Sequence, residues 1–255
     1  METIEKVCDS AVAKLKLLNK SKLSYLISSA LAGAFVGLGI ILIFTIGGNL
    51  SAANSPATKI VMGLSFGIAL SLVLMAGSEL FTGNNMIFTI STMEKKTSWK
   101  DTSRIWIYSY VGNLIGAVVL AFMFAHSGLT KGVVGNFIVK TAGLKMHTPF
   151  LELFIRGILC NILVCLAVWC FIKLKEETSK LIMIFWCLFA FITSGFEHSI
   201  ANMTLLAIAL FIPHSSQVTL TGFMYNLSAV TLGNMVGGAL FVGLAYWMVL
   251  RENNN

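Results

Sequence analysis

Two short polar segments interrupt otherwise apolar stretches of the sequence. The first, Gly77 to Asn85, contains Glu79, and the second, Gly195 to Asn202, contains Glu197 beside His198. An imidazole, whose unperturbed pKa is about 6.5, is the side chain best suited to take or lend a proton near neutral pH. An ionisable residue inside an apolar stretch is costly, so we expect His198 to serve the passage of a small ion.

The two glutamates have two competing interpretations. A carboxylate suits a cation site or a proton relay, but it also suits the backbone N–H groups that an interrupted helix leaves free. We favour the structural interpretation for Glu79 and Glu197, and we expect Asn84 and Asn202 to support the same helix breaks.

The elements that position these residues are expected to be membrane helices. Hydrophobic residues occupy 56% of the 255 positions and charged residues 11%, whereas a soluble domain carries about 25% charged residues. The basic residues form short clusters between long uncharged stretches, which indicates topology signals and no nucleic-acid partner. The five cysteines form no CxxC pair, and the histidines lack metal-ligand spacing. The sequence therefore predicts an all-α integral membrane protein without a cofactor or metal.

Six spans account for the apolar stretches, because a bilayer core takes about 20 helical residues. The stretches 60–93 and 181–212 are too long for one crossing and too short for two with a loop. Each is therefore expected to be interrupted at its polar segment, giving broken second and fifth helices. The other four spans are expected at about 23–47, 105–125, 151–172 and 222–249.

The two halves of the chain match each other at these interruptions. The segment 77–84 recurs at 195–202 with its first glycine, its glutamate and its last asparagine at the same spacing. The pattern Gly-Asn-X-X-Gly at 112–116 recurs at 233–237. Because three spans per copy is an odd number, the second copy must be inverted in the membrane. The expected repeats are two inverted three-helix units, at about 23–127 and 150–250.

The chain ends and the charges give the expected topology. Residues 1–22 place apolar positions at intervals of three and four, which predicts an amphipathic helix along the membrane surface and not a cleaved leader. With a cytoplasmic N-terminus, thirteen Lys and Arg fall inside and four Lys outside, with Arg156 at a span edge. The positive-inside rule therefore favours cytoplasmic termini, including a tail at 251–255, in the cytoplasmic (inner) membrane. The four outer lysines are Lys59, Lys131, Lys140 and Lys145.

The segments Gly77 to Asn84, Gly157 to Asn161 and Gly195 to Met203 resemble the signatures of the formate/nitrite transporter family. The resemblance covers nearly the whole chain and is close to the bacterial nitrite channels through 33–45, 62–83 and 161–167. It implies a homopentamer in membrane lipid, in which each aquaporin-like protomer holds a pore for small inorganic or carboxylate anions.

The resemblance also implies roles for individual residues. The central pore histidine falls on His198, the hydroxyl of the first broken helix on Thr82, a polar fourth-helix residue on Asn161, and the vestibule lysine on Lys145. From the residues alone, Lys145 belongs to a solvated loop, and the apolar candidates would be ordinary packing. The apolar constriction falls on Leu70, Leu80, Phe81 and Val164 on the cytoplasmic side and on Phe66 and Phe191 on the outer side.

The expected activity is transport of a weak-acid anion, most simply nitrite. A charged anion in a narrow apolar passage loses several kcal/mol of hydration, and protonation removes most of that cost. Formate, hydrosulfide and a water or neutral-solute channel remain alternatives, because pore width is not encoded in the residue pattern. An intramembrane protease is disfavoured, and we expect no enzyme activity. Ser199 adjoins His198 without a GxSG motif, and neighbours on a helix do not face each other.

Overall fold

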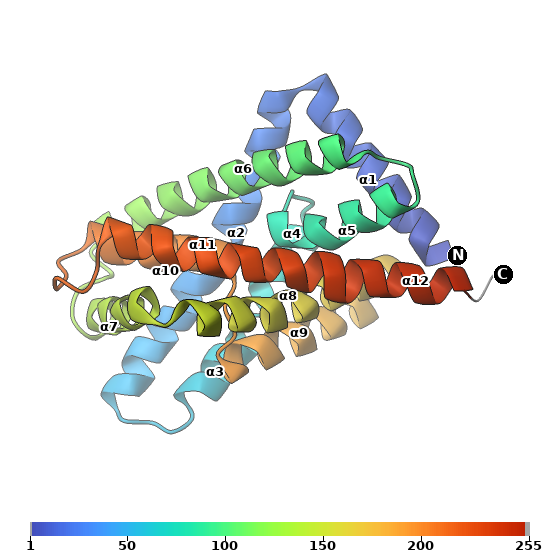
Figure 1. Cartoon of the computed structure of the whole chain (residues 1–255). Coiled ribbons are helices and arrows are strands. Elements are labelled where there is room, and N and C mark those ends of the chain that lie inside the picture. Colours follow the sequence, from blue (N-terminus) through green and yellow to red (C-terminus); the bar gives the residue numbers. More distant parts are fainter. Residues whose placement is uncertain (1, 253–255) are drawn as a thin grey trace.

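The structure is a computed structural model that describes residues 2–252, with side chains for residues 2–250. Residues 253–255 of the expected tail lie outside this range. All regular elements in the described residues are helical, so the predicted all-α class is confirmed (Figure 1). The helices are α1 (Glu2–Lys20), α2 (Lys22–Ala52), α3 (Thr58–Ser65), α4 (Gly67–Met75), α5 (Phe81–Met93), α6 (Trp99–His126), α7 (Val133–His147), α8 (Phe150–Lys173), α9 (Glu177–Ser194), α10 (Ser199–Phe211), α11 (Leu220–Val236), the π-helical η1 (Gly237–Leu244) and α12 (Ala245–Glu252).

Among the described residues, six helical segments are long and apolar enough to cross a membrane, as the sequence predicts. They correspond to α2, α3 with α4, α6, α8, α9, and the continuous stretch from α11 to α12. Along the outer faces of these helices, large apolar side chains such as Leu23 and Ile107 are more than half exposed. The protein is therefore a multi-pass membrane protein. The start of α1 and the end of α12 lie at one end of the molecule, whereas α7 lies at the opposite end (Figure 1).

Short non-helical segments separate α4 from α5 and α9 from α10. They cover residues 76–80 and 195–198. Gly77 and Gly195 have φ angles of 77° and 76°, in the left-handed region that glycine adopts without a steric penalty. In the second segment the Gly195 N–H donates to the carbonyls of Phe191 and Ile192 and closes the end of α9. The sequence did not predict a further irregularity at Phe66, which separates α3 from α4.

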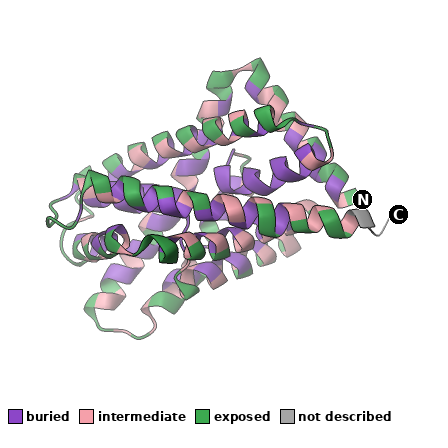
Figure 2. Ribbon diagram, in the orientation of Figure 1, coloured by how far each residue is buried: buried purple, intermediate pink, exposed green. Residues whose placement is uncertain are grey.

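The two helices that follow these segments lie in the centre of the molecule. Every residue of α5 except Met93 is buried, which makes α5 purple along its length in Figure 2. In α10, residues 199–209 are buried. The helix α5 packs against α1, α6, α8 and η1, and α10 packs against α2, α6, α7 and α11. Their polar residues are thus enclosed by protein, which is the condition for irregular backbone at membrane depth.

The N-terminal helix covers the part of this core formed by α5. Its apolar stripe, including Ile4, Val7 and Ala11, is buried and packs mainly against α5, with further contacts to α2 and α8. The helix is amphipathic as expected, but its stripe contacts protein instead of facing the membrane. This arrangement brings the polar face of α1 close to the first non-helical segment.

Two long helix pairs approach each other at glycines. A methyl group at Gly116 of α6 would overlap the Ala30 carbonyl of α2. In the second half of the chain, a methyl group at Gly237 would overlap the Ile158 carbonyl of α8. Small residues allow such close approach of membrane helices. The glycines of the two Gly-Asn-X-X-Gly patterns are therefore packing positions, and they bring the intervening asparagines into the core.

Replacing Gly116 with Val should destabilise the protein, because the new side chain meets backbone that cannot rotate away. Overpacking of this kind costs about 1–3 kcal/mol or more. Thermal unfolding of detergent-purified protein measures the effect. Gly67→Val is the matched control, since the nearest atom to a Cβ there is Phe185 Cδ2 at 3.5 Å. Equal unfolding temperatures for the two variants would contradict the packing assigned to α2 and α6.

Candidate functional site

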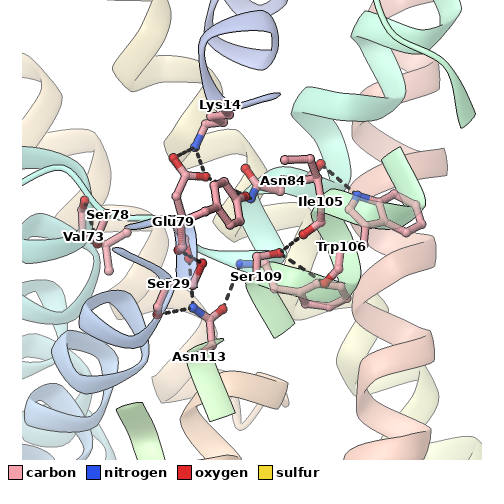
Figure 3. A network of polar contacts seen from close by, with 12 residues as sticks. Lys14, Ser29, Val73, Ser78, Glu79, Asn84, Ile105, Trp106, Ser109 and Asn113 are labelled. Carbon is pink, nitrogen blue, oxygen red and sulfur yellow. Dashed lines mark hydrogen bonds and ion pairs between the residues drawn. The ribbon is translucent and has the colours of Figure 1, made fainter. Parts of the chain in front are cut away.

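The first non-helical segment carries a buried carboxylate that is paired with a lysine. Both oxygens of Glu79 accept hydrogen bonds from Lys14 Nζ, at 2.9 and 2.8 Å, and the Tyr25 hydroxyl donates to it at 3.0 Å. Asn84 Nδ2 adds a contact at 3.3 Å. Figure 3 shows Lys14 reaching from α1 toward this carboxylate. The ion pair therefore ties the N-terminal helix to the break between α4 and α5.

The second segment has a corresponding pair at the other end of the molecule. Glu197 accepts from Lys145 Nζ at 2.7 and 2.6 Å, and Asn202 Nδ2 donates to it at 2.7 Å. The same Asn202 also donates to Asn226 Oδ1 at 2.8 Å. The expectation that Lys145 lies in a solvated loop is wrong. It lies on α7, and its side chain is 21% exposed.

Two asparagines, not the glutamates, bind the backbone N–H groups that the breaks leave free. Asn113 Oδ1 accepts from the Phe81 N–H at 3.0 Å, and Asn234 Oδ1 accepts from the Ser199 N–H at 2.9 Å. Each asparagine also donates to the carbonyl of the preceding glutamate, at 2.9 and 3.0 Å. The expected use of the carboxylates for these N–H groups is therefore wrong. Asn113 and its contacts to α2 and the break are labelled in Figure 3.

The sequence carried a signal for these asparagines. They are the second residues of the two Gly-Asn-X-X-Gly patterns, whose repetition in the two halves marks them but does not indicate a hydrogen-bond partner. Lys14 and Tyr25 were also missed as partners of Glu79, because their separations of 65 and 54 residues have no local pattern.

His198 and Thr82 meet where α5 and α10 begin. The His198 Nε2 atom lies 3.0 Å from the Thr82 hydroxyl, and its Nδ1 accepts from the Ala201 N–H at 3.2 Å. Because a backbone N–H can only donate, Nδ1 carries no proton, and in the neutral ring the proton is on Nε2. The imidazole is thus the N-cap of α10 and a hydrogen-bond donor toward Thr82. Both side chains are buried.

Two adjacent cavities meet at His198. The smaller, about 10 Å³, is lined by apolar side chains and His198. The larger, about 320 Å³, also reaches Lys145 and Glu197 and is called the vestibule below. Phe191 and His198 line both cavities. At the boundary between the two cavities, the Phe191 ring packs edge-on against the Phe66 ring, with the ring centroids 5.5 Å apart.

Most of the predicted constriction residues come together in the smaller cavity. Phe81 does not, because its ring packs against Tyr110 at 5.1 Å and lines a separate cavity between α6 and α11. Leu80 ends the non-helical segment with an extended backbone (φ −100°, ψ 124°), and side chains that follow each other on extended backbone point to opposite sides, so Phe81 faces away from Leu80. The predicted residues in the smaller cavity are Leu70, Leu80, Val164, Phe66 and Phe191, and the sequence missed Val36, Ala69 and Leu188.

The structure places Asn161 behind the cavities. Its Nδ2 donates to the Asn234 carbonyl at 2.6 Å, to the Thr82 carbonyl at 3.2 Å and to Asn85 Oδ1 at 3.2 Å. It is fully buried and lines neither cavity described above. It therefore connects α8 to the backbone of α5 and α11.

The arrangement combines hydrogen-bonding groups with an apolar wall. One imidazole N–H and one hydroxyl face each other beside an apolar cavity, and a lysine-bearing vestibule adjoins them. Within the described residues, no group of three His, Cys, Asp or Glu side chains is placed to hold a metal ion. Fold and site together define a multi-pass helical membrane protein with two adjoining cavities between its helices.

The formate/nitrite transporter family model matches residues 1–248. The chain is 45% identical over 254 residues to the nitrite transporter NirC of Escherichia coli (strain K12), covering 99% of this chain and 93% of that protein. A solved FNT family ion channel is similar with a TM-score of 0.92 at 44% identity, covering 97% of this chain and 98% of that one. A pentameric formate channel with formate bound has a TM-score of 0.80 at 32% identity, covering 91% and 98%. The chain belongs to the formate/nitrite transporter family.

Removing the lysine of the second ion pair should destabilise the protein. Lys145→Gln leaves the Glu197 carboxylate, whose side chain is 4% exposed, without its cation, and breaking a buried pair costs about 3 kcal/mol. Thermal unfolding in detergent measures the loss. Lys140→Gln on the same helix is the control, because Lys140 is exposed.

The double variant Lys145→Gln with Glu197→Gln should recover much of the stability, since no unpaired charge then remains. A Lys145→Gln protein as stable as the parent would show that the pair is solvated and unimportant for folding.

Proposed function

We propose that the protein transports small monovalent weak-acid anions across the cytoplasmic membrane, with nitrite as the principal substrate. Each protomer of a homopentamer holds one pore. The 45% identity to a protein named as a nitrite transporter supports the substrate. The similarity to a pentameric formate channel supports the assembly. The same similarity makes formate the second candidate substrate.

The observation that carries this proposal is the position of the His198–Thr82 pair between an apolar cavity and a lysine-bearing vestibule. The smaller cavity has His198 as its one polar lining residue among those described. A hydrated ion does not pass such a surface without losing water, which costs several kcal/mol for a charged solute. A weak-acid anion avoids most of this cost by taking a proton. Nitrite, formate and hydrosulfide all have this property.

We further propose an aquaporin-like arrangement of two inverted repeats, with broken second and fifth helices and cytoplasmic termini. The matching contacts of the two halves support it. The ion pair Lys14–Glu79 corresponds to Lys145–Glu197. In each half, an asparagine side chain also accepts a hydrogen bond from the N–H of the first residue of the helix that follows the break. The excess of cytoplasmic Lys and Arg supports the orientation. In this scheme α1 is a cytoplasmic helix, and the vestibule opens on the outer face.

The roles of the pore residues follow from their hydrogen bonds. His198 can donate from Nε2–H, and the Thr82 hydroxyl can accept or donate. A solute that enters between them replaces the hydrogen bond between His198 and Thr82 with its own hydrogen bonds to these two groups. Lending the Nε2 proton outright requires Nδ1 to take one, and Nδ1 already accepts from Ala201. Proton transfer through the ring is thereby coupled to loss of the N-cap of α10. Asn161 supports the Thr82 carbonyl from behind.

The proposal is tested by competitive anion flux in proteoliposomes across pH. Nitrite uptake that formate inhibits, and that rises as the external pH falls, is the expected result. Swelling in a neutral osmolyte without anion uptake would instead identify a water or neutral-solute channel.

His198→Phe should reduce nitrite flux sharply, because it removes both ring nitrogens at similar bulk. Losing a hydrogen bond worth about 1.4 kcal/mol at the barrier lowers the rate roughly tenfold. The variant should also respond less to pH than the parent, because it has no ring nitrogen that could exchange a proton with the solute.

His198→Asn is the matched variant, since asparagine is a good N-cap and a neutral hydrogen-bonding group. We expect it to conduct while its flux responds less to pH than that of the parent. An Asn variant with the parental rate and the parental pH profile would show that the imidazole exchanges no proton.

A further inference from the structure

The ionisable residues that line the vestibule do not contribute equally to its charge. Among its described lining residues they are Lys59, Lys145, Glu197 and His198. Lys145 and Glu197 form an ion pair at 2.6 Å, so their charges largely cancel. His198 accepts a backbone N–H at Nδ1 and is neutral in this arrangement. The one positive charge without a counter-charge at this cavity is Lys59.

Lys59 is free of the contacts that hold Lys145. It is exposed, and within the described part of the chain its ammonium makes no hydrogen bond and no ion pair. Its side chain nevertheless borders the same cavity as Lys145. An unpaired ammonium beside a cavity keeps its full charge available to a solute that enters.

The stability of α3 does not explain a lysine at this position. Lys59 is the second residue of α3, whose first turn contains no acidic residue. Cations are unfavourable in the first turn of a helix, where the backbone N–H groups already carry partial positive charge. Ala57, the N-cap residue of α3, supplies no side-chain hydrogen bond to the start of the helix. A residue that breaks a local rule without a structural gain is expected to serve a function.

We infer that Lys59 supplies the net positive charge that draws anions into the vestibule, and that Lys145 chiefly holds Glu197 in place. The inference rests on the proposed function, because it concerns how the transported anion arrives. A cavity with low-dielectric walls focuses the field of one charge and raises the local concentration of counter-ions. Since Lys59 is exposed, salt should screen its effect. It acts on entry and does not touch the anion at His198.

The test uses a graded charge series in the full-length protein, reconstituted in zwitterionic lipid. Lys59→Gln removes the charge, and Lys59→Glu reverses it. Lys131→Glu is the matched control, because Lys131 is exposed on the same predicted face but lines neither cavity. Initial nitrite uptake is measured well below saturation, at about 10 mM and about 300 mM ionic strength of a poorly permeant salt.

At low ionic strength we expect nitrite uptake to fall about twofold to threefold in Lys59→Gln and about fivefold to tenfold in Lys59→Glu. At high ionic strength both variants should approach the parent, and Lys131→Glu should match the parent in both conditions. Unfolding temperatures should not change, because an exposed unpaired charge contributes little to stability.

Parental uptake by Lys59→Glu at low ionic strength would overturn the inference. So would a loss of equal size at both ionic strengths, since that would indicate a steric or structural effect. Recovery of the parental rate in zwitterionic lipid with a loss in anionic lipid would show that Lys59 anchors to lipid headgroups instead. Failure of the proposed function is distinct, because then the parent itself would take up neither nitrite nor formate above empty liposomes.

Discussion

The structure depends on hydrogen-bond partners for the backbone N–H groups at the first residues of helices that begin in the apolar interior of the protein. Each such group is costly when it has no partner, and a membrane supplies no water to replace one. The asparagines Asn113 and Asn234 meet this need, because each accepts the N–H at the start of a central helix and donates to the carbonyl before it. The close glycine contacts of α6 with α2 and of α11 with α8 bring both asparagines within reach.

The pore residues use the same local geometry. His198 caps α10 through Nδ1, so its Nε2 must point outward toward Thr82 at the start of α5. The glutamate of each non-helical segment pairs with a lysine from a neighbouring helix, Lys14 of α1 or Lys145 of α7. At the second non-helical segment, His198 thus lines both cavities, and the Lys145–Glu197 pair lines the vestibule. Lys59, which takes no part in this framework, is left to interact with the solute.

The sequence predicted the local features and missed the distant ones. The positions of the two non-helical segments followed from the length of the apolar stretches and from the polar residues that begin at Gly77 and Gly195. The lysine partners did not, because a pair separated by 52 or 65 residues leaves no trace in spacing. Phe81 lies outside the smaller cavity, which the motif could not indicate, because a motif names adjacent residues without giving the direction of each side chain. The resemblance to a family supplied the rest of the constriction, which an apolar pattern alone cannot distinguish from packing.

The central claim is that asparagines outside the pore hold the pore residues in place, and nitrite flux of an Asn234→Leu variant tests it most directly. Leucine has a similar volume but accepts no hydrogen bond from Ser199, so the start of α10 and its His198 cap should shift. Measured per correctly assembled protein in proteoliposomes, the flux should fall roughly tenfold, although Asn234 lines neither the smaller cavity nor the vestibule. A folded Asn234→Leu protein that transports nitrite at the parental rate would contradict the account.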